Sequence, residues 1–219
     1  MSERWALGRM QNPVRGFLHG GAAVLAIAGA AGLVVISHSW TMRIAASVFG
    51  IAMIALFTTS SLYHSIPWSH LWKKRLQRVD HSMIYTFIAA TYTPAVLVVL
   101  DSPWRWAMLA VIWGIAISGI GQHAFFPTES TGFSVGLATT MGWIGLLLIW
   151  PFVQRVGFVA IGLTVLGGVL YTVGMVFLVT NRPRLWPRVF SYHEAFHVLV
   201  VLAAGAHFVV VARYLIPLG

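Results

Sequence analysis

The chain of 219 residues contains no cysteine and only five acidic residues. Without cysteine there can be no disulfide bonds or thiolate metal ligands, so any metal site must use histidine and carboxylate side chains. Lysine is also scarce, because Lys73 and Lys74 are the only two in the chain. Both lie in a polar connector between apolar runs, which excludes a retinal protein with a Schiff-base lysine inside a span.

Charged residues make up 9% of the chain and the mean hydropathy is +0.82, whereas about 25% of the residues in a soluble protein are charged. The apolar runs begin too far into the chain and recur too often for a signal peptide. Because a membrane-spanning helix needs roughly 20 apolar residues, the sequence predicts an all-α integral membrane protein with seven transmembrane helices. We expect one domain, residues 1–219, in which residues 1–16 form an amino-terminal segment. The predicted spans are residues 17–36, 44–64, 80–100, 105–122, 133–153, 156–179 and 190–215.

Basic residues concentrate on one side of this predicted bundle, with ten on the side of the amino terminus and four on the other. By the positive-inside rule, the amino terminus, with residues 1–16, is expected in the cytoplasm and the carboxyl terminus outside. The net charge of +9 then reflects topology and not nucleic-acid binding. We therefore expect a multi-pass protein of the plasma membrane; nothing in the sequence indicates its oligomeric state. The ten are Arg4, Arg9, Arg15, Lys73, Lys74, Arg75, Arg78, Arg182, Arg184 and Arg188, and the four are Arg43, Arg105, Arg155 and Arg213.

Polar side chains from three predicted spans converge near the cytoplasmic face. His64 ends the second span, Asp80 begins the third, and His193 and His197 begin the seventh. Residues four apart lie on one helical face, so His193 and His197 can reach a single point. Three imidazoles suit a tetrahedral zinc ion whose fourth position is open to water, as in catalytic sites. The pattern predicts Zn²⁺ bound by His64, His193 and His197, whereas two histidines four apart on one helix cannot supply the opposed axial ligands of one haem.

Asp80 and Ser60 are the predicted catalytic residues. Zinc lowers the pKa of its bound water to about 7, and Asp80 could take the proton of that water. Ser60 precedes His64 by one helical turn and shares its face. It could orient the water or a substrate carbonyl, or hold the imidazole. Alternatively, its hydroxyl could simply bond to the carbonyl four residues earlier in its own helix.

Other ionisable residues have less defined roles. Glu194 is next to His193 but is expected to face away from it, towards lipid headgroups. His81 is expected to support the zinc site without binding the ion, or to pack against the second span. His19 could line the cavity at the predicted zinc site. His207 lies deep in the seventh span without an identified partner.

Pro94 lies inside the third span and cannot donate a backbone hydrogen bond to the carbonyl of Ala90. A kink that opens a cavity in the bundle is therefore expected here. The hydroxyl of Thr91 or Thr93 could satisfy the freed carbonyl.

With these motifs in place, the chain resembles the bacterial haemolysin III family, which is grouped with the adiponectin and progestin receptors. The resemblance covers essentially all seven predicted spans, and the three spaced motifs together are highly specific. One departure is that family members often carry acidic and asparagine residues about a turn before the first-helix histidine. In this chain the segment before His19 is Val14-Arg15-Gly16-Phe17-Leu18, which contains no acidic residue. The matching motifs are Ser60-x-x-x-His64, the stretch from Asp80-His81-Ser82 to Thr91-Tyr92-Thr93-Pro94, and His193-Glu194-Ala195-Phe196-His197 through His207-Phe208.

The resemblance implies a seven-helix bundle with its amino terminus inside. It also implies zinc held by His64, His193 and His197, with Asp80 bonded to the zinc-bound water. Receptor relatives are associated with ceramidase-like amide hydrolysis, and bacterial members are named for haemolytic activity.

Two functions fit these residues. The first is a zinc-dependent hydrolase of membrane lipid amides or esters, in which Asp80 is the general base for the zinc-bound water and an apolar cavity takes acyl chains. The alternative is a pore-forming, haemolytic or receptor-like protein in which zinc only clamps the second, third and seventh spans. Asp80→Asn separates them, because this change would abolish hydrolysis but not a function that needs only the clamp.

Overall fold

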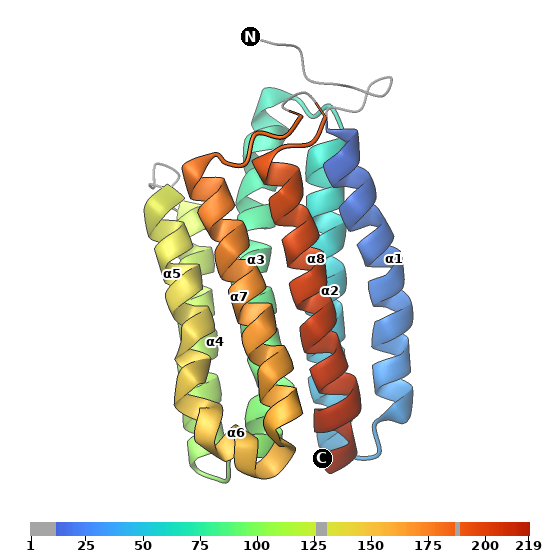
Figure 1. Ribbon diagram of the computed structural model, residues 1–219, viewed down its shortest axis with the longest axis vertical. Helices are drawn as coiled ribbons and strands as arrows, with labels where there is room; N and C mark the ends of the chain where they lie inside the picture. The colour runs from blue at the N-terminus through green and yellow to red at the C-terminus, as the bar shows by residue number, and fades with distance from the viewer. Residues whose placement is uncertain (1–11, 126–130, 187–188) are drawn as a thin grey trace.

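The computed structural model describes residues 12–125, 131–186 and 189–219, and this part of the chain is almost entirely helical. Seven segments are long and apolar enough to cross a membrane, which confirms the predicted number of spans. They run alternately up and down as a bundle, so that α1 begins at one end and the chain finishes at the other (Figure 1). The helices are α1 (Pro13–Ile36), α2 (Trp40–Ser65), α3 (His70–Val99), α4 (Trp104–Phe125), α5 (Thr131–Trp143), η1 (Ile144–Leu148), α6 (Ile149–Val156), α7 (Phe158–Thr180), α8 (Tyr192–Val210), η2 (Val211–Leu215) and η3 (Ile216–Leu218).

Several helices, α1 and α3 among them, extend further than the predicted spans. α3 begins at His70 and not at residue 80, and α1 begins at Pro13 and not at residue 17. Hydropathy marks where a helix enters the hydrocarbon layer, whereas the hydrogen-bonded helix can begin outside that layer. Proline also suits the first turn of α1, where its missing N–H needs no partner. Three of the counted basic residues, Arg4, Arg9 and Arg188, lie outside the described residues.

The fifth span, Gly132–Val156, is not a single α-helix. It changes from α5 to the 3₁₀ segment η1 and then to α6. The Tyr92 hydroxyl of α3 donates to the backbone carbonyls of Met141 and Gly142, at 3.0 and 2.8 Å, just before this change. Backbone carbonyls at membrane depth need such partners. Tyr92, which belongs to the Thr91-to-Pro94 motif, therefore has a structural role.

α3 continues through Pro94 to Val99. The Thr91 hydroxyl donates to the Phe87 carbonyl at 2.8 Å, and the Thr93 hydroxyl donates to the Ala89 carbonyl at 3.1 Å. The expectation that one of them satisfies the Ala90 carbonyl is therefore wrong. Each hydroxyl turns back to the carbonyl four residues earlier, which is the usual reach of a threonine in a helix.

One core cluster lies where α1, α2, α3 and α8 meet, and a second lies between α3, α4 and α5. Many large apolar side chains remain exposed on the outside of the bundle. Examples are Leu25, Val35, Leu147 and Phe158, each at least 74% exposed. Exposed apolar surface of this extent suits contact with lipid and not with water. We call the end at which α1 begins the site end, because α2 finishes and α8 begins there as well (Figure 1).

Candidate metal centre

Three histidines from two helices meet at the site end. His64 lies in the last turn of α2, and His193 and His197 lie in the first two turns of α8. One ring nitrogen of each lies within 4.8 Å of the corresponding atoms of the other two. The ring centroids are 4.8 Å apart for His64 and His197, and 5.2 Å apart for His64 and His193. These three side chains form a group that could hold a metal ion.

The environment of the three imidazoles fits such an ion. His64 and His197 are buried, and His193 is half-buried. The Nδ1 atom of His197 is buried and has no hydrogen-bond partner among the described residues. An unpaired buried nitrogen is unfavourable unless something binds it. Imidazole nitrogens are common ligands of zinc, and three of them leave a fourth position for another ligand.

Ser60 and Asp80 join α2 to α3 beside the histidines. Ser60 is only 3% exposed, lies one turn before His64, and makes a side-chain hydrogen bond to Asp80. The sequence did not indicate this contact between Ser60 and Asp80. The contact places a half-buried carboxylate against the helix that carries His64.

His19 of α1 lies against the histidine group. Its ring centroid is 4.1 Å from that of His197 and 5.1 Å from that of Phe57, and the rings of His19 and Phe57 form an edge-to-face pair. The side chain is 2% exposed, and neither ring nitrogen makes a well-formed hydrogen bond within the described part of the chain. α1 therefore contributes a fourth imidazole, which packs against His197. The sequence left the role of His19 open, and the structure places it in contact with the three-histidine group.

Glu194 does not face lipid headgroups, so that expectation is wrong. Its side chain accepts a hydrogen bond from Nε of Arg15 at 2.7 Å, and both side chains are less than 10% exposed. The second carboxylate oxygen accepts from the backbone N–H of Ser191 at 2.8 Å, which completes a capping box at the start of α8. This cap turns Glu194 back over the helix end and towards α1. The pattern Ser191-x-x-Glu194 is a sequence signal for the cap, but nothing in the sequence indicates a partner 179 residues away.

His81 also lies elsewhere than expected. Its ring is 5.5 Å from that of His123 on α4, so it packs away from the second span. Successive residues on a helix point about 100° apart, so a helix that turns Asp80 to α2 turns His81 towards another neighbour. His207 stacks with Tyr171 of α7, at a ring distance of 6.0 Å.

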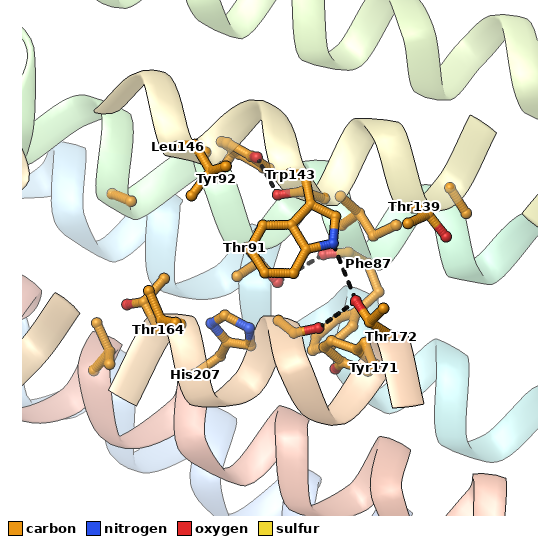
Figure 2. A pocket seen from close by; sticks show the side chains of 18 of the residues that line it. Phe87, Thr91, Tyr92, Thr139, Trp143, Leu146, Thr164, Tyr171, Thr172 and His207 are labelled. Carbon is orange, nitrogen blue, oxygen red and sulfur yellow. Dashed lines mark hydrogen bonds between the residues drawn. The ribbon is translucent and has the colours of Figure 1, made fainter. Parts of the chain in front are cut away.

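An apolar cavity of about 190 Å³ begins one helical turn from the histidines. Leu56, Ile84 and Val200 line its near end, and they lie one turn from Ser60, Asp80 and His197, respectively. The cavity continues between α3, α5, α7 and α8, as Figure 2 shows. The same three helices, α2, α3 and α8, therefore carry both the candidate site and one end of the cavity lining.

The chain is similar to one protein family model and to several known membrane and haemolysin proteins. The family model described as Haemolysin-III related matches residues 8–208, a range that contains all of the candidate site residues. Hemolysin-3 of Bacillus cereus is 33% identical over 202 residues, which cover 91% of this chain and 89% of that protein. The Monocyte to macrophage differentiation factor of Homo sapiens is 28% identical over 210 residues, covering 91% of this chain and 82% of its own. The Heptahelical transmembrane protein ADIPOR2 of Oryza sativa subsp. japonica is 29% identical over 149 residues, covering 61% of this chain and 65% of its own.

Proposed function

This chain belongs to the haemolysin III family, and we propose that it is a zinc-dependent hydrolase of amide or ester bonds in membrane lipids. The observation that carries the proposal is the three-histidine group, which has a carboxylate beside it and an apolar cavity one turn away. We further propose that the single domain lies in the plasma membrane with its amino terminus in the cytoplasm. The site end then faces the inner leaflet, and the substrate is a membrane lipid.

Each residue of the site has a distinct role in this proposal. His64, His193 and His197 hold the zinc ion, and the unpaired Nδ1 of His197 supports this assignment. When bound, zinc supplies a Lewis acid that polarises the lipid carbonyl and acidifies a water molecule. Asp80 accepts the proton of the attacking water and acts as the general base. Ser60 donates a hydrogen bond that holds the Asp80 carboxylate in place.

The surroundings position these groups. The ion pair between Arg15 and Glu194 fixes the start of α8, and His193 and His197 project from the first two turns of this helix. The cavity receives the acyl chain of the lipid, and its apolar walls keep bulk water from the chain.

Asp80 favours catalysis over a metal site that only clamps helices. Among the described residues it has no ion-pair partner, and it lies outside the group of three that could share an ion. A carboxylate inside a membrane-spanning segment is costly and usually has a function there. A clamp would need the three imidazoles but would not need this carboxylate.

The test is lipid hydrolysis by purified, zinc-loaded protein in nanodiscs, measured on a panel of ceramides, other acyl amides and phospholipid esters. We expect Asp80→Asn to lower the rate by about 10²-fold or more, because a general base contributes about that factor. Zinc content and the thermal unfolding temperature should not change. The matched control is Asp101→Asn, which alters a carboxylate at the opposite end that pairs with Arg155 at 2.9 Å, and this variant should keep the wild-type rate.

The name of the Bacillus cereus relative suggests a second candidate, a haemolytic or pore-forming protein with a purely structural metal. The three histidines favour it to the extent that they join α2 to α8. If fully zinc-loaded protein leaves the whole lipid panel intact, or if Asp80→Asn keeps the wild-type rate, the hydrolase proposal is wrong and the clamp takes its place.

A further inference from the structure

The cavity contains a polar pair that the proposed hydrolysis does not use. Tyr171 on α7 and His207 on α8 both line it, with ring planes 14° apart (Figure 2). The Tyr171 hydroxyl is buried and has no hydrogen-bond partner within the described part of the chain. An unpaired hydroxyl in an apolar membrane interior is unfavourable, so a hydrogen-bond partner at this point would stabilise it.

Four other hydroxyls in the cavity are already satisfied. Tyr92, Thr91, Thr164 and Thr172 each donate to a backbone carbonyl, at distances between 2.8 and 3.0 Å. Thr172 in addition accepts a hydrogen bond from the Trp143 indole at 3.0 Å, as drawn in Figure 2. Tyr171 differs from these four, because its hydroxyl has no such partner among the residues that the structure describes.

The fold makes room for the imidazole beside Tyr171. A Cβ atom on Gly167 of α7 would lie 2.6 Å from Nε2 of His207, so only glycine leaves space for the ring in this position. Gly167 is one turn from Tyr171 on the same helix. The rings of Tyr171 and His207 are therefore held side by side by the packing of α7 against α8.

The dimensions of the cavity suit a single hydrocarbon chain. Its lining on α7 extends from position 161 to position 175, which is about 21 Å at 1.5 Å per residue. A volume of about 190 Å³ over that length is narrow, and this favours an extended chain over a fused ring system. Along α8, positions 197 and 207 are separated by about 15 Å, so a chain whose headgroup lies at the histidine group passes Tyr171 and His207 part-way along its length.

We propose that this cavity selects acyl chains that carry a hydroxyl group part-way along the chain, and that Tyr171 and His207 bind that hydroxyl. A chain hydroxyl can accept a hydrogen bond from Tyr171 and donate one to an imidazole nitrogen of His207. An unsubstituted chain leaves the Tyr171 hydroxyl without a partner. The inference rests on the proposed function only in placing the headgroup at the histidine group, and binding itself requires no hydrolysis.

The test is displacement of a fluorescent fatty acid from the zinc-loaded protein in detergent, with stearate compared to a positional series of hydroxystearates. We expect one mid-chain isomer to bind about five- to tenfold more tightly than stearate, the usual effect of a buried hydrogen bond. Tyr171→Phe should reduce this ratio to about one while the affinity for stearate is kept. The matched control is Tyr92→Phe, which removes a hydroxyl from the same cavity, but one already bonded to α5.

Equal affinity for stearate and every hydroxystearate in the wild-type protein would overturn the inference, and that comparison does not depend on the folding of a variant. Selectivity that survives Tyr171→Phe would overturn it as well. Free fatty acids contain no amide or ester bond, so these outcomes are independent of turnover. A wild-type protein that selects hydroxylated chains but hydrolyses no lipid would contradict the proposed function alone.

Discussion

At the scale of single residues, the polar side chains of the site end are tolerated in a membrane protein because they bind one another across helices. Ser60 of α2 bonds to Asp80 of α3, and Arg15 of α1 pairs with Glu194 of α8. Each contact joins a group that is costly in lipid to a partner on another helix. The chemistry proposed for this end therefore depends on the relative placement of four helices.

Removal of one imidazole should release the metal. We expect about one zinc ion per wild-type chain, and its loss from His64→Ala and from His197→Ala, because two remaining ligands bind far more weakly than three. His207→Ala is the matched control, since it removes a histidine from the same helix as His197 and should keep the zinc. Elemental analysis of detergent-purified protein measures this, and zinc retained in both ligand variants would exclude the site.

The ion pair of Arg15 and Glu194 gives a prediction about stability. Arg15→Met leaves a carboxylate that is only 9% exposed without its guanidinium, so we expect a loss of about 3–5 kcal/mol in unfolding free energy. The double variant Arg15→Met with Glu194→Gln should lose less, because no unpaired charge remains and glutamine can still accept from the Ser191 N–H. A double-mutant cycle by thermal unfolding in detergent measures the coupling. Strictly additive effects would show that the two side chains do not depend on each other.

At the scale of elements, the bundle is built on small residues that let helices approach closely. Gly50 of α2 is buried against Ala30 of α1, and a Cβ atom on Gly50 would lie 2.5 Å from the Ala30 Cβ and 3.1 Å from its Cα. The backbone of α1 cannot yield as a flexible side chain would. Contacts between small residues of this kind are typical of membrane helices.

Gly50→Ala should therefore destabilise the protein, by about 1–3 kcal/mol, as overpacking does in other cores. The compensating change Ala30→Gly should recover most of the loss in the double variant. Gly32→Ala is the control, because a Cβ at that position of α1 meets nothing within 4 Å. Thermal unfolding of the four proteins gives the comparison, and equal unfolding temperatures for Gly50→Ala and Gly32→Ala would contradict the packing argument.

At the scale of the whole molecule, the two ends of the bundle differ in their charge. Among the described residues, the opposite end has four basic residues, and there Arg155 forms an ion pair with Asp101. The site end has exposed positive charge at Lys74 and Arg75, at the start of α3. The asymmetry favours a cytoplasmic site end, and this orientation is still a prediction.

A natural chain without cysteine makes the orientation simple to measure. Lys74→Cys and His38→Cys introduce single thiols at exposed positions on opposite ends of the bundle. In intact cells, a membrane-impermeant maleimide should label His38→Cys, and it should label Lys74→Cys only after permeabilisation. The reverse pattern would place the site end outside the cell.

The sequence by itself determined the number of spans, because the thickness of the hydrocarbon layer requires long apolar runs that can be read locally. It also indicated that His64, His193 and His197 share one end of the bundle. Seven alternating spans put the end of the second and the start of the seventh at the same level, and the helical period puts two of these histidines on one face. Whether zinc binds there stays a prediction.

Only the tertiary structure decided which helical faces meet. It turned Glu194 to Arg15 instead of to lipid, His81 to His123 instead of to the second span, and Ser60 to Asp80 instead of to its own helix. The cavity that contains Tyr171 also became visible only in the tertiary structure, because its walls come from helices distant in sequence. The physical reason is that hydropathy and periodicity fix where a residue lies along its own helix. The partner of a polar group depends on how neighbouring helices are rotated and packed, and that is set by contacts between residues far apart in the chain.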